Sequence, residues 1–248
     1  MTTIAVSGKG GVGKTLVATM IVKNLVENKK GSVLAIDADP DSNLAESLGV
    51  KFDKTVGDIR EEITEKKVPP GVDRVKYLDG KLFEITVEAK GFDLLVMGRP
   101  EGPGCYCAVN HMLREIVDKV SKSYNFAVID AEAGLEHLSR RTTQNVDTML
   151  IVTDSSRKGF QTATRIRELA RELDIKFDRV FLVLNRVSAK NQKEMRKLGA
   201  ETGLKVITEI PEDEQVKDFD LKGKALMKLP ADSPVYASIL DIVKGVVS

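Results

Sequence analysis

The 248-residue chain has no tryptophan, only two cysteines and two histidines, and no apolar run long enough to cross a membrane. The missing apolar run argues against an integral membrane protein, and two cysteines are too few for a disulfide-stabilised secreted scaffold. Lys and Arg number 38 against 37 Asp and Glu, a net charge of +1. Because no charge of one sign dominates, we expect neither nucleic acid nor a membrane surface to be the main partner.

The first residues, "MTTIAVSGKG", run directly into an apolar β-type segment without a basic and apolar leader. We therefore expect a cytoplasmic protein. The two cysteines, Cys105 and Cys107, are separated by one residue. In a reducing compartment such a pair is more suited to metal or redox chemistry than to a disulfide, which would be strained at this spacing.

Short apolar runs rich in β-branched residues alternate with segments of helical periodicity. Apolar runs of this kind are typical of parallel strands covered on both faces, and parallel strands need helical connections. The pattern predicts an α/β fold, a single-domain, mostly parallel twisted sheet flanked by helices. The expected strands are 3–7, 33–37, 94–97, 126–130, 149–153, 180–185 and 206–210, and the expected helices include 15–27, 109–120, 159–173 and 190–202. Residues 50–108 are the least regular part and are expected to form an excursion that carries both cysteines.

The first expected strand ends in "SGKGGVGKT", which fits the phosphate-loop pattern G-x-x-x-x-G-K-[ST] between a strand and a helix. Backbone N–H groups of such a loop wrap a phosphate chain, the lysine reaches the β- and γ-phosphates, and the hydroxyl ligates Mg²⁺. The expected nucleotide contacts are Gly8, Gly10, Gly11, Val12, Gly13, Lys14, Thr15 and Leu16.

Aspartates follow two further expected strands, at Asp37 and Asp39 in "IDADPDSN" and at Asp130 in "FAVIDAEAG". Carboxylates at the ends of strands beside a phosphate loop can order the attacking water or the shell of a magnesium ion. Gly134, four residues after Asp130, is free to sense the γ-phosphate.

The phosphate loop contains a second lysine, Lys9, so that "KGGVGKT" resembles the deviant Walker A motif of the MinD, ParA and nitrogenase iron protein superfamily. The resemblance implies a P-loop ATPase domain spanning residues 1–248. It also implies that Lys9 reaches across a homodimer to the partner's nucleotide and that Asp39 orients the attacking water. We therefore expect Lys9, Lys14 and Asp39 to be catalytic, with Asp37 and Thr15 in the magnesium shell.

The same superfamily recognises adenine at positions that correspond to Asn185 and Arg186 in "LVLNRV" and to Pro211 and Glu212 in "EIPED". Ser188 stands where GTP-selective proteins carry an aspartate, which favours ATP/ADP. One departure is Leu16, because most of the superfamily has a second hydroxyl residue there; one α-phosphate contact is therefore expected to be absent.

In extended backbone, Cys105 and Cys107 project to the same side and can bind one metal ion together. Two thiolates do not complete a four-coordinate site. His111 and another residue, or the same two cysteines of a second chain around a two-fold axis, would supply the remaining ligands.

The flanking segments "GPGCYCAVNHML" and "DAEAGLEHLSRRT" resemble the CooC-type nickel-insertion ATPases of carbon monoxide dehydrogenase maturation. That resemblance implies a Mg²⁺-dependent ATPase whose homodimer binds Ni²⁺, or Zn²⁺ in its place, through Cys105 and Cys107 of both chains. It would deliver nickel to carbon monoxide dehydrogenase or acetyl-CoA synthase.

Three alternatives remain. The first is an iron protein type ATP-dependent reductase with a dimer-bridging Fe–S cluster, and the second is a dimer with structural zinc. The third is a MinD- or ParA-like positioning ATPase. MinD ends in a basic amphipathic helix, whereas "SPVYASILDIVKGVVS" contains only Lys244 as a basic residue, which argues against a membrane role.

Overall fold

The computed structural model describes residues 1–64, 74–98, 123–131, 146–172 and 177–247. Their strands form one eight-stranded sheet in the order β3-β4-β2-β5-β1-β6-β7-β8, parallel except for β3, which pairs antiparallel with β4. The strands are β1 (Thr2–Gly8), β2 (Val33–Ala38), β3 (Val87–Ala89), β4 (Phe92–Val96), β5 (Phe126–Ala131), β6 (Thr148–Thr153), β7 (Arg179–Val187) and β8 (Lys205–Pro211). The expectation of a mostly parallel sheet flanked by helices is confirmed.

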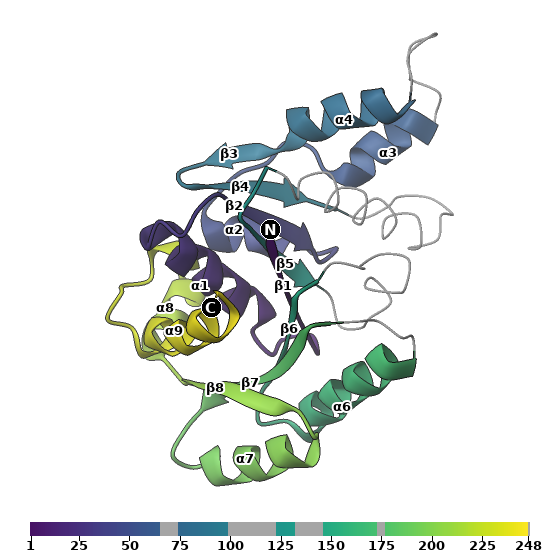
Figure 1. Cartoon of the computed structure of the whole chain (residues 1–248). Coiled ribbons are helices and arrows are strands. Elements are labelled where there is room, and N and C mark those ends of the chain that lie inside the picture. Colours follow the sequence, from purple (N-terminus) through teal and green to yellow (C-terminus); the bar gives the residue numbers. More distant parts are fainter. Residues whose placement is uncertain (65–73, 99–122, 132–145, 173–176, 248) are drawn as a thin grey trace.

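Helices cover both faces of the sheet (Figure 1). They are α1 (Lys14–Glu27), α2 (Asn43–Leu48), α3 (Val56–Thr64), α4 (Arg74–Ile85), α6 (Arg157–Glu172), α7 (Gln192–Glu201), α8 (Glu214–Leu221), the 3₁₀ turn η2 (Leu226–Lys228) and α9 (Pro234–Val247). Helices α1, α2 and α9 lie on one face, whereas α6 and α7 lie on the other. The phosphate loop thus starts from the centre of a three-layer α/β structure.

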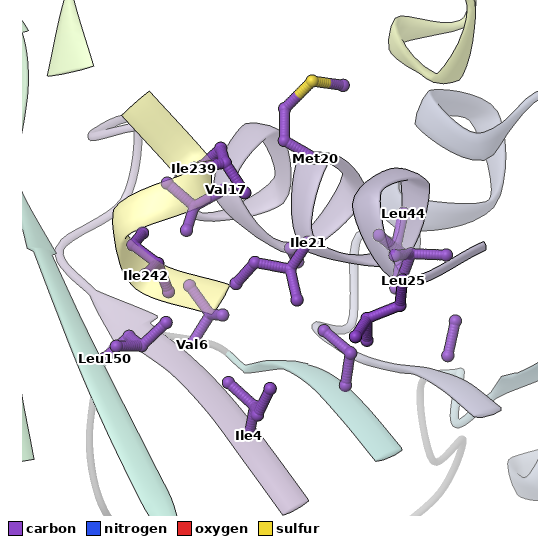
Figure 2. Packing of buried hydrophobic residues seen from close by; sticks show 14 of the residues in the cluster. Ile4, Val6, Val17, Met20, Ile21, Leu25, Leu44, Leu150, Ile239 and Ile242 are labelled. Carbon is purple, nitrogen blue, oxygen red and sulfur yellow. The ribbon is translucent and has the colours of Figure 1, made fainter. Parts of the chain in front are cut away.

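Alternate residues of each strand enter different cores. Ile4 and Val6 of β1 pack with α1 and α9, as Figure 2 shows, while Ala5 between them joins the core under α6. The same alternation separates Val128 from Ile129 in β5. Because both faces are apolar, the strands appear in the sequence as unbroken apolar runs.

All seven expected strands are present, and the expected helices 15–27, 159–173 and 190–202 correspond to α1, α6 and α7. The expected helix 109–120 lies outside the described residues. Strand β3 was not anticipated, since three residues give too short a periodic signal.

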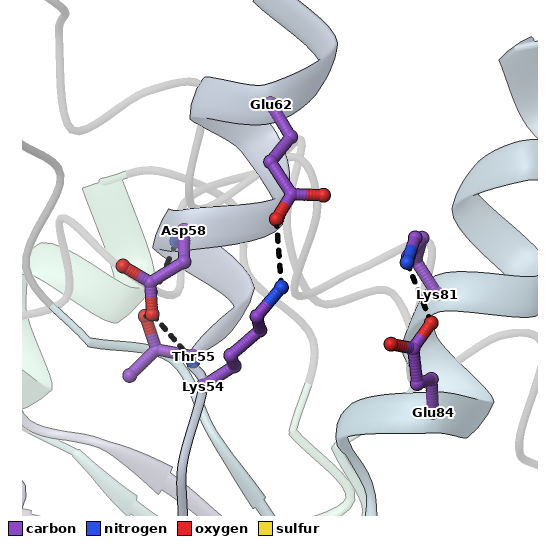
Figure 3. Close-up of polar contacts among 6 residues, drawn as sticks. All are labelled: Lys54, Thr55, Asp58, Glu62, Lys81 and Glu84. Atoms are coloured by element: carbon purple, nitrogen blue, oxygen red, sulfur yellow. Dashed lines mark hydrogen bonds and ion pairs between the residues drawn. The ribbon is translucent and has the colours of Figure 1, made fainter. Parts of the chain in front are cut away.

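Within residues 50–108 the structure describes α3, α4, β3 and β4, of which only a strand at 94–97 was expected. Helix α3 is fixed by a reciprocal cap: the Asp58 carboxylate accepts hydrogen bonds from Thr55 N and Thr55 Oγ1, and Thr55 Oγ1 accepts from Asp58 N (Figure 3). Lys54–Glu62 and Lys81–Glu84 ion pairs lie on the surface of α3 and α4. Among the described side chains, Val56 and Ile59 of α3 and Ile85 of α4 are buried.

Across the described ranges, no helix is long and apolar enough to span a membrane. Helix α9, the most apolar of the late helices, instead buries Val235, Ile239, Ile242 and Val246 against α1 and the sheet.

Candidate functional site

The phosphate loop connects β1 to α1 and borders a cleft of about 530 Å³ at the carboxyl edge of the sheet. Gly10, Gly11, Gly13, Lys14, Thr15 and Leu16 line one part of the cleft, and Asp39, Asn185, Arg186, Pro211 and Glu212 line others. Four segments that lie far apart in the sequence therefore meet around one cavity.

Two glycines of the loop are required by its geometry. Gly8 has φ 150°, and a Cβ added there would collide with the carbonyl of Val152 on the neighbouring strand β6. Gly13 has φ 97°, and its Cβ would collide with the side-chain amide of Asn185. At these two positions a side chain would push the loop away from the strands that hold it.

Lys14 is buried at the first position of α1, and its Nζ lies 3.7 Å from Asp39 Oδ2. Asp39 Oδ1 accepts a hydrogen bond from Asp41 N at 3.1 Å, which orients the carboxylate. The structure therefore brings two of the three expected catalytic residues together at the cleft. The third, Lys9, is half-buried and does not line this cleft.

Thr15 and Asp130 form the group best suited to Mg²⁺. Thr15 Oγ1 donates to Asp130 Oδ2 at 2.6 Å, while the buried Asp130 Oδ1 has no hydrogen-bond partner among the described residues. An unpaired carboxylate oxygen beside a hydroxyl is a fitting environment for a hydrated hard cation, which prefers oxygen ligands. In the described part of the chain, no group of three or more His, Cys, Asp or Glu side chains is placed to hold a metal ion.

Asp37 lies opposite Asp130 in the β2–β5 register. Its two oxygens accept hydrogen bonds from Asp39 N at 3.3 Å and Leu44 N at 2.9 Å, and thereby fix the loop between β2 and α2. Burial, reinforced by the Asp130 charge, raises the pKa of Asp37 to about 7. Burial also raises the pKa of Asp130 to about 6, although the Thr15 hydrogen bond and Lys14 oppose this effect. A bound cation would relieve this cost of ionisation.

The expected adenine contacts also line this cleft. Asn185 and Arg186 lie just before the last residue of β7. Pro211 is the last residue of β8, and Glu212 follows it and donates from its N to the carbonyl of Val187. Asn185 is buried and Arg186 is exposed.

The cleft has further walls that were not anticipated from the sequence. They are formed by residues in and beside α2, α8 and η2 and by one residue of α9: Asp41, Asn43, Glu46, Ser47, Asp213, Val216, Lys217, Phe219, Asp220, Gly223, Lys224, Leu226 and Val235. No local motif marks these residues, because they reach the cleft only through the packing of their helices. Cys105, Cys107, His111 and Gly134 lie outside the described residues.

A phosphate loop followed by a buried helix, two strand-end carboxylates and a parallel three-layer sheet define the protein as a P-loop nucleotide-binding protein. Residues 3–226 match the family model described as the CobQ/CobB/MinD/ParA nucleotide binding domain. The chain belongs to this family.

Relatives and solved structures agree with that assignment. The chain is 50% identical to an uncharacterized ATP-binding protein of Methanocaldococcus jannaschii, over 99% of this chain and 98% of that protein. It is 35% identical to the carbon monoxide dehydrogenase accessory protein CooC of Rhodospirillum rubrum, over 70% of each chain. In fold it is similar to a chain of the MinC:MinD cell division protein complex of Aquifex aeolicus, with a TM-score of 0.73, 21% identity and coverage of 100% and 96%.

Proposed function

We propose that this protein is an ATP-hydrolysing homodimeric metallochaperone that binds nickel through Cys105 and Cys107 of both chains and inserts it into carbon monoxide dehydrogenase or acetyl-CoA synthase. The observation that carries the metal part is the C-x-C pair in a chain 35% identical to a carbon monoxide dehydrogenase accessory protein. The nucleotide part is supported by the cleft, where Lys14, Thr15, Asp39 and Asp130 converge.

In the proposed reaction, backbone N–H groups of the phosphate loop and Lys14 hold the β- and γ-phosphates of ATP. Asp39, within 3.7 Å of Lys14, orients a water molecule toward the γ-phosphate. Thr15, Asp130 and Asp37 would hold Mg²⁺ and its water shell, and the cation would offset negative charge on the phosphates. Lys9 of the partner chain would add positive charge in the transition state.

Metal binding is coupled to this reaction through the dimer. ATP closes the dimer, closure brings four thiolates together, and hydrolysis loosens the site so that the metal leaves. Four thiolates suit soft metals and accommodate square-planar nickel or tetrahedral zinc. Coupling of this kind is reciprocal, so nickel tightens the nucleotide-bound dimer.

Anaerobic nickel titration tests the proposal. Wild-type protein and a Cys105→Ser/Cys107→Ser double variant are titrated with ADP or with a non-hydrolysable ATP analogue. We expect one nickel per wild-type dimer, altered by the nucleotide and lost in the variant. A Lys14→Ala control, which keeps both thiols, is expected to bind nickel without a nucleotide response. Nickel binding that ignores the cysteines would remove the metal function and leave a dimeric ATPase.

A MinD-like positioning function is the second candidate, favoured by the fold similarity. Its membrane-bound form needs a free amphipathic helix, whereas α9 has its apolar face in the core. Sedimentation with anionic liposomes in the presence of ATP separates the two candidates. We expect the protein to remain in the supernatant, and ATP-dependent pelleting would favour positioning.

A further inference from the structure

Asn185 is held by two hydrogen bonds that have no need of a nucleotide. Its Nδ2 donates to the carbonyl of Val12 at 2.8 Å, and its Oδ1 accepts from Arg186 N at 2.9 Å. The side chain is 2% exposed. The first bond crosses from the end of β7 to the middle of the phosphate loop, 173 residues away in the sequence.

The orientation of the amide follows from its partners. A backbone carbonyl needs a donor and a backbone N–H needs an acceptor, so Nδ2 must face Val12 and Oδ1 must face Arg186. The same Nδ2 occupies the space that a Cβ on Gly13 would take. Gly13, whose φ is positive, therefore lies directly against the Asn185 side chain. Asn185 therefore contacts two consecutive residues of the phosphate loop.

The end of β7 is built to hold Asn185 in this position. Arg186 has φ 58°, an uncommon backbone conformation for a residue other than glycine. Its carbonyl accepts a hydrogen bond from Asn191 Nδ2 at 3.1 Å, and Asn191 Oδ1 accepts from Ser188 N at 2.8 Å. The pairing of β7 with β8 becomes irregular at the same place, between Leu184 and Val187.

We infer that Asn185 is a positioning residue for the phosphate loop: it holds Val12 and Gly13 in the phosphate-binding conformation, and phosphate affinity depends on it whether or not a base is present. The resemblance to the superfamily implied only adenine recognition for this residue. Because both of its polar atoms bond to the protein's own backbone, its contribution to the loop does not require contact with a base. Loss of the amide would leave the buried Val12 carbonyl unpaired and free the loop to move.

Inorganic tripolyphosphate, which has no base and no sugar, is the decisive probe. Its Mg²⁺ complex and Mg·ATP are titrated calorimetrically into wild-type protein and into Asn185→Ala and Asn185→Ser. We expect the alanine variant to bind both ligands about tenfold more weakly, because one buried hydrogen bond is lost. The factor should be similar for tripolyphosphate and for ATP. Either variant suffices if the other does not fold.

Asn125→Ala is the control, since it removes a side-chain amide that pairs with Ser32 before the amino end of β5, at the edge of the sheet opposite the phosphate loop. We expect it to bind tripolyphosphate less than threefold more weakly than wild type, as roughly 0.6 kcal/mol would allow. A folded Asn185 variant that binds tripolyphosphate as tightly as wild type overturns the inference, whatever its affinity for ATP. The inference rests only on phosphate binding, so a failed nickel titration would leave it intact.

Discussion

At the residue scale, the candidate site contains two buried carboxyl groups, those of Asp37 and Asp130, whose ionised form would be stabilised by a bound cation. Asp37 and Asp130 face one another on adjacent central strands, and both are fully buried. In the absence of a cation, burial raises both pKa values. Ionisation of these carboxyl groups is therefore costly in the folded protein, and a cation bound beside Thr15 would lower that cost.

Replacement of Asp130 by asparagine should change the pH dependence of stability. The folded pKa of about 6 exceeds the unfolded value of about 3.9, so the folded state binds more protons between these values. The free energy of unfolding of ligand-free wild type therefore falls as pH rises from 4 to 7. Asp130→Asn should remove on the order of 2 kcal/mol of that fall and weaken Mg²⁺-dependent nucleotide binding.

Urea denaturation without Mg²⁺ at pH 4.5 and pH 8 measures the effect. Asp53→Asn, a substitution of an exposed acid that does not line the cleft, is the control for the removal of one negative charge. An equal fall in wild type and Asp130→Asn would show that the Asp130 carboxyl titrates normally in the folded protein.

At the scale of elements, α9 connects the end of the chain to the helix that follows the phosphate loop. Tyr236 Oη donates to Glu27 Oε2 at the end of α1, at 2.5 Å. Lys23 Nζ, also on α1, lies 5.3 Å from the Tyr236 ring centroid and donates to the carbonyl of Met227 in η2. Helix α9 is thereby a structural support for α1 and not a free surface helix.

Arg179 at the start of β7 stabilises the last turn of α9. Its Nη1 and Nη2 donate to the carbonyls of Gly245 and Val246 at 2.8 and 2.9 Å, where the helix dipole is negative. Arg179→Ala should lower the free energy of unfolding by about 2 kcal/mol, because two charge-assisted bonds are lost.

Arg196→Ala is the comparison, since Arg196 pairs with Glu209 at the surface and its side chain is 61% exposed. It should cost less than about 1 kcal/mol. Both variants are measured by urea denaturation. Equal losses of unfolding free energy in the two variants would mean that the two Arg179 bonds to α9 contribute no more than a surface ion pair.

At the scale of the whole molecule, the parallel sheet brings separate strand ends to one edge. Strand β1 lies between β5 and β6, so the phosphate loop starts beside Asp130 on one side and Val152 on the other. The cleft then extends across α1 to the ends of β7 and β8. Lys9 is half-buried and is not among the residues that line it.

Mixing two inactive variants tests whether Lys9 acts across the proposed dimer. Lys9→Ala and Asp39→Ala should each lose ATP hydrolysis while remaining folded. In a mixed dimer, the site with its own Asp39 also receives Lys9 from the partner, so that one site of two works. Equimolar mixing should restore about a quarter of wild-type activity, because about half of the dimers are mixed.

Phosphate release at increasing total protein concentration is the readout, with each variant alone as the control. If Lys9 acts on the nucleotide of its own chain, mixing restores nothing. If Lys9→Ala alone hydrolyses ATP normally, it is not catalytic.

The sequence by itself determined the parts of this protein that depend on local patterns. Unbroken apolar runs predicted seven strands of the sheet, because parallel strands are buried on both faces. The glycines, Lys14 and Thr15 predicted the phosphate loop, since a short backbone segment carries the whole motif. The C-x-C pair was equally visible, although its geometry lies outside the described residues.

Only the tertiary structure decided which distant residues act together. Asp37 lies beside Asp130 because β2 and β5 are neighbours in the sheet, and the order of strands is not written in either strand. The amide of Asn185 donates to Val12 because the end of β7 lies beside the phosphate loop. Residues of α8 and those around η2 also line the cleft, although no sequence motif marks them. These relations arise from packing between segments that lie far apart in the sequence, and a local sequence pattern does not contain them.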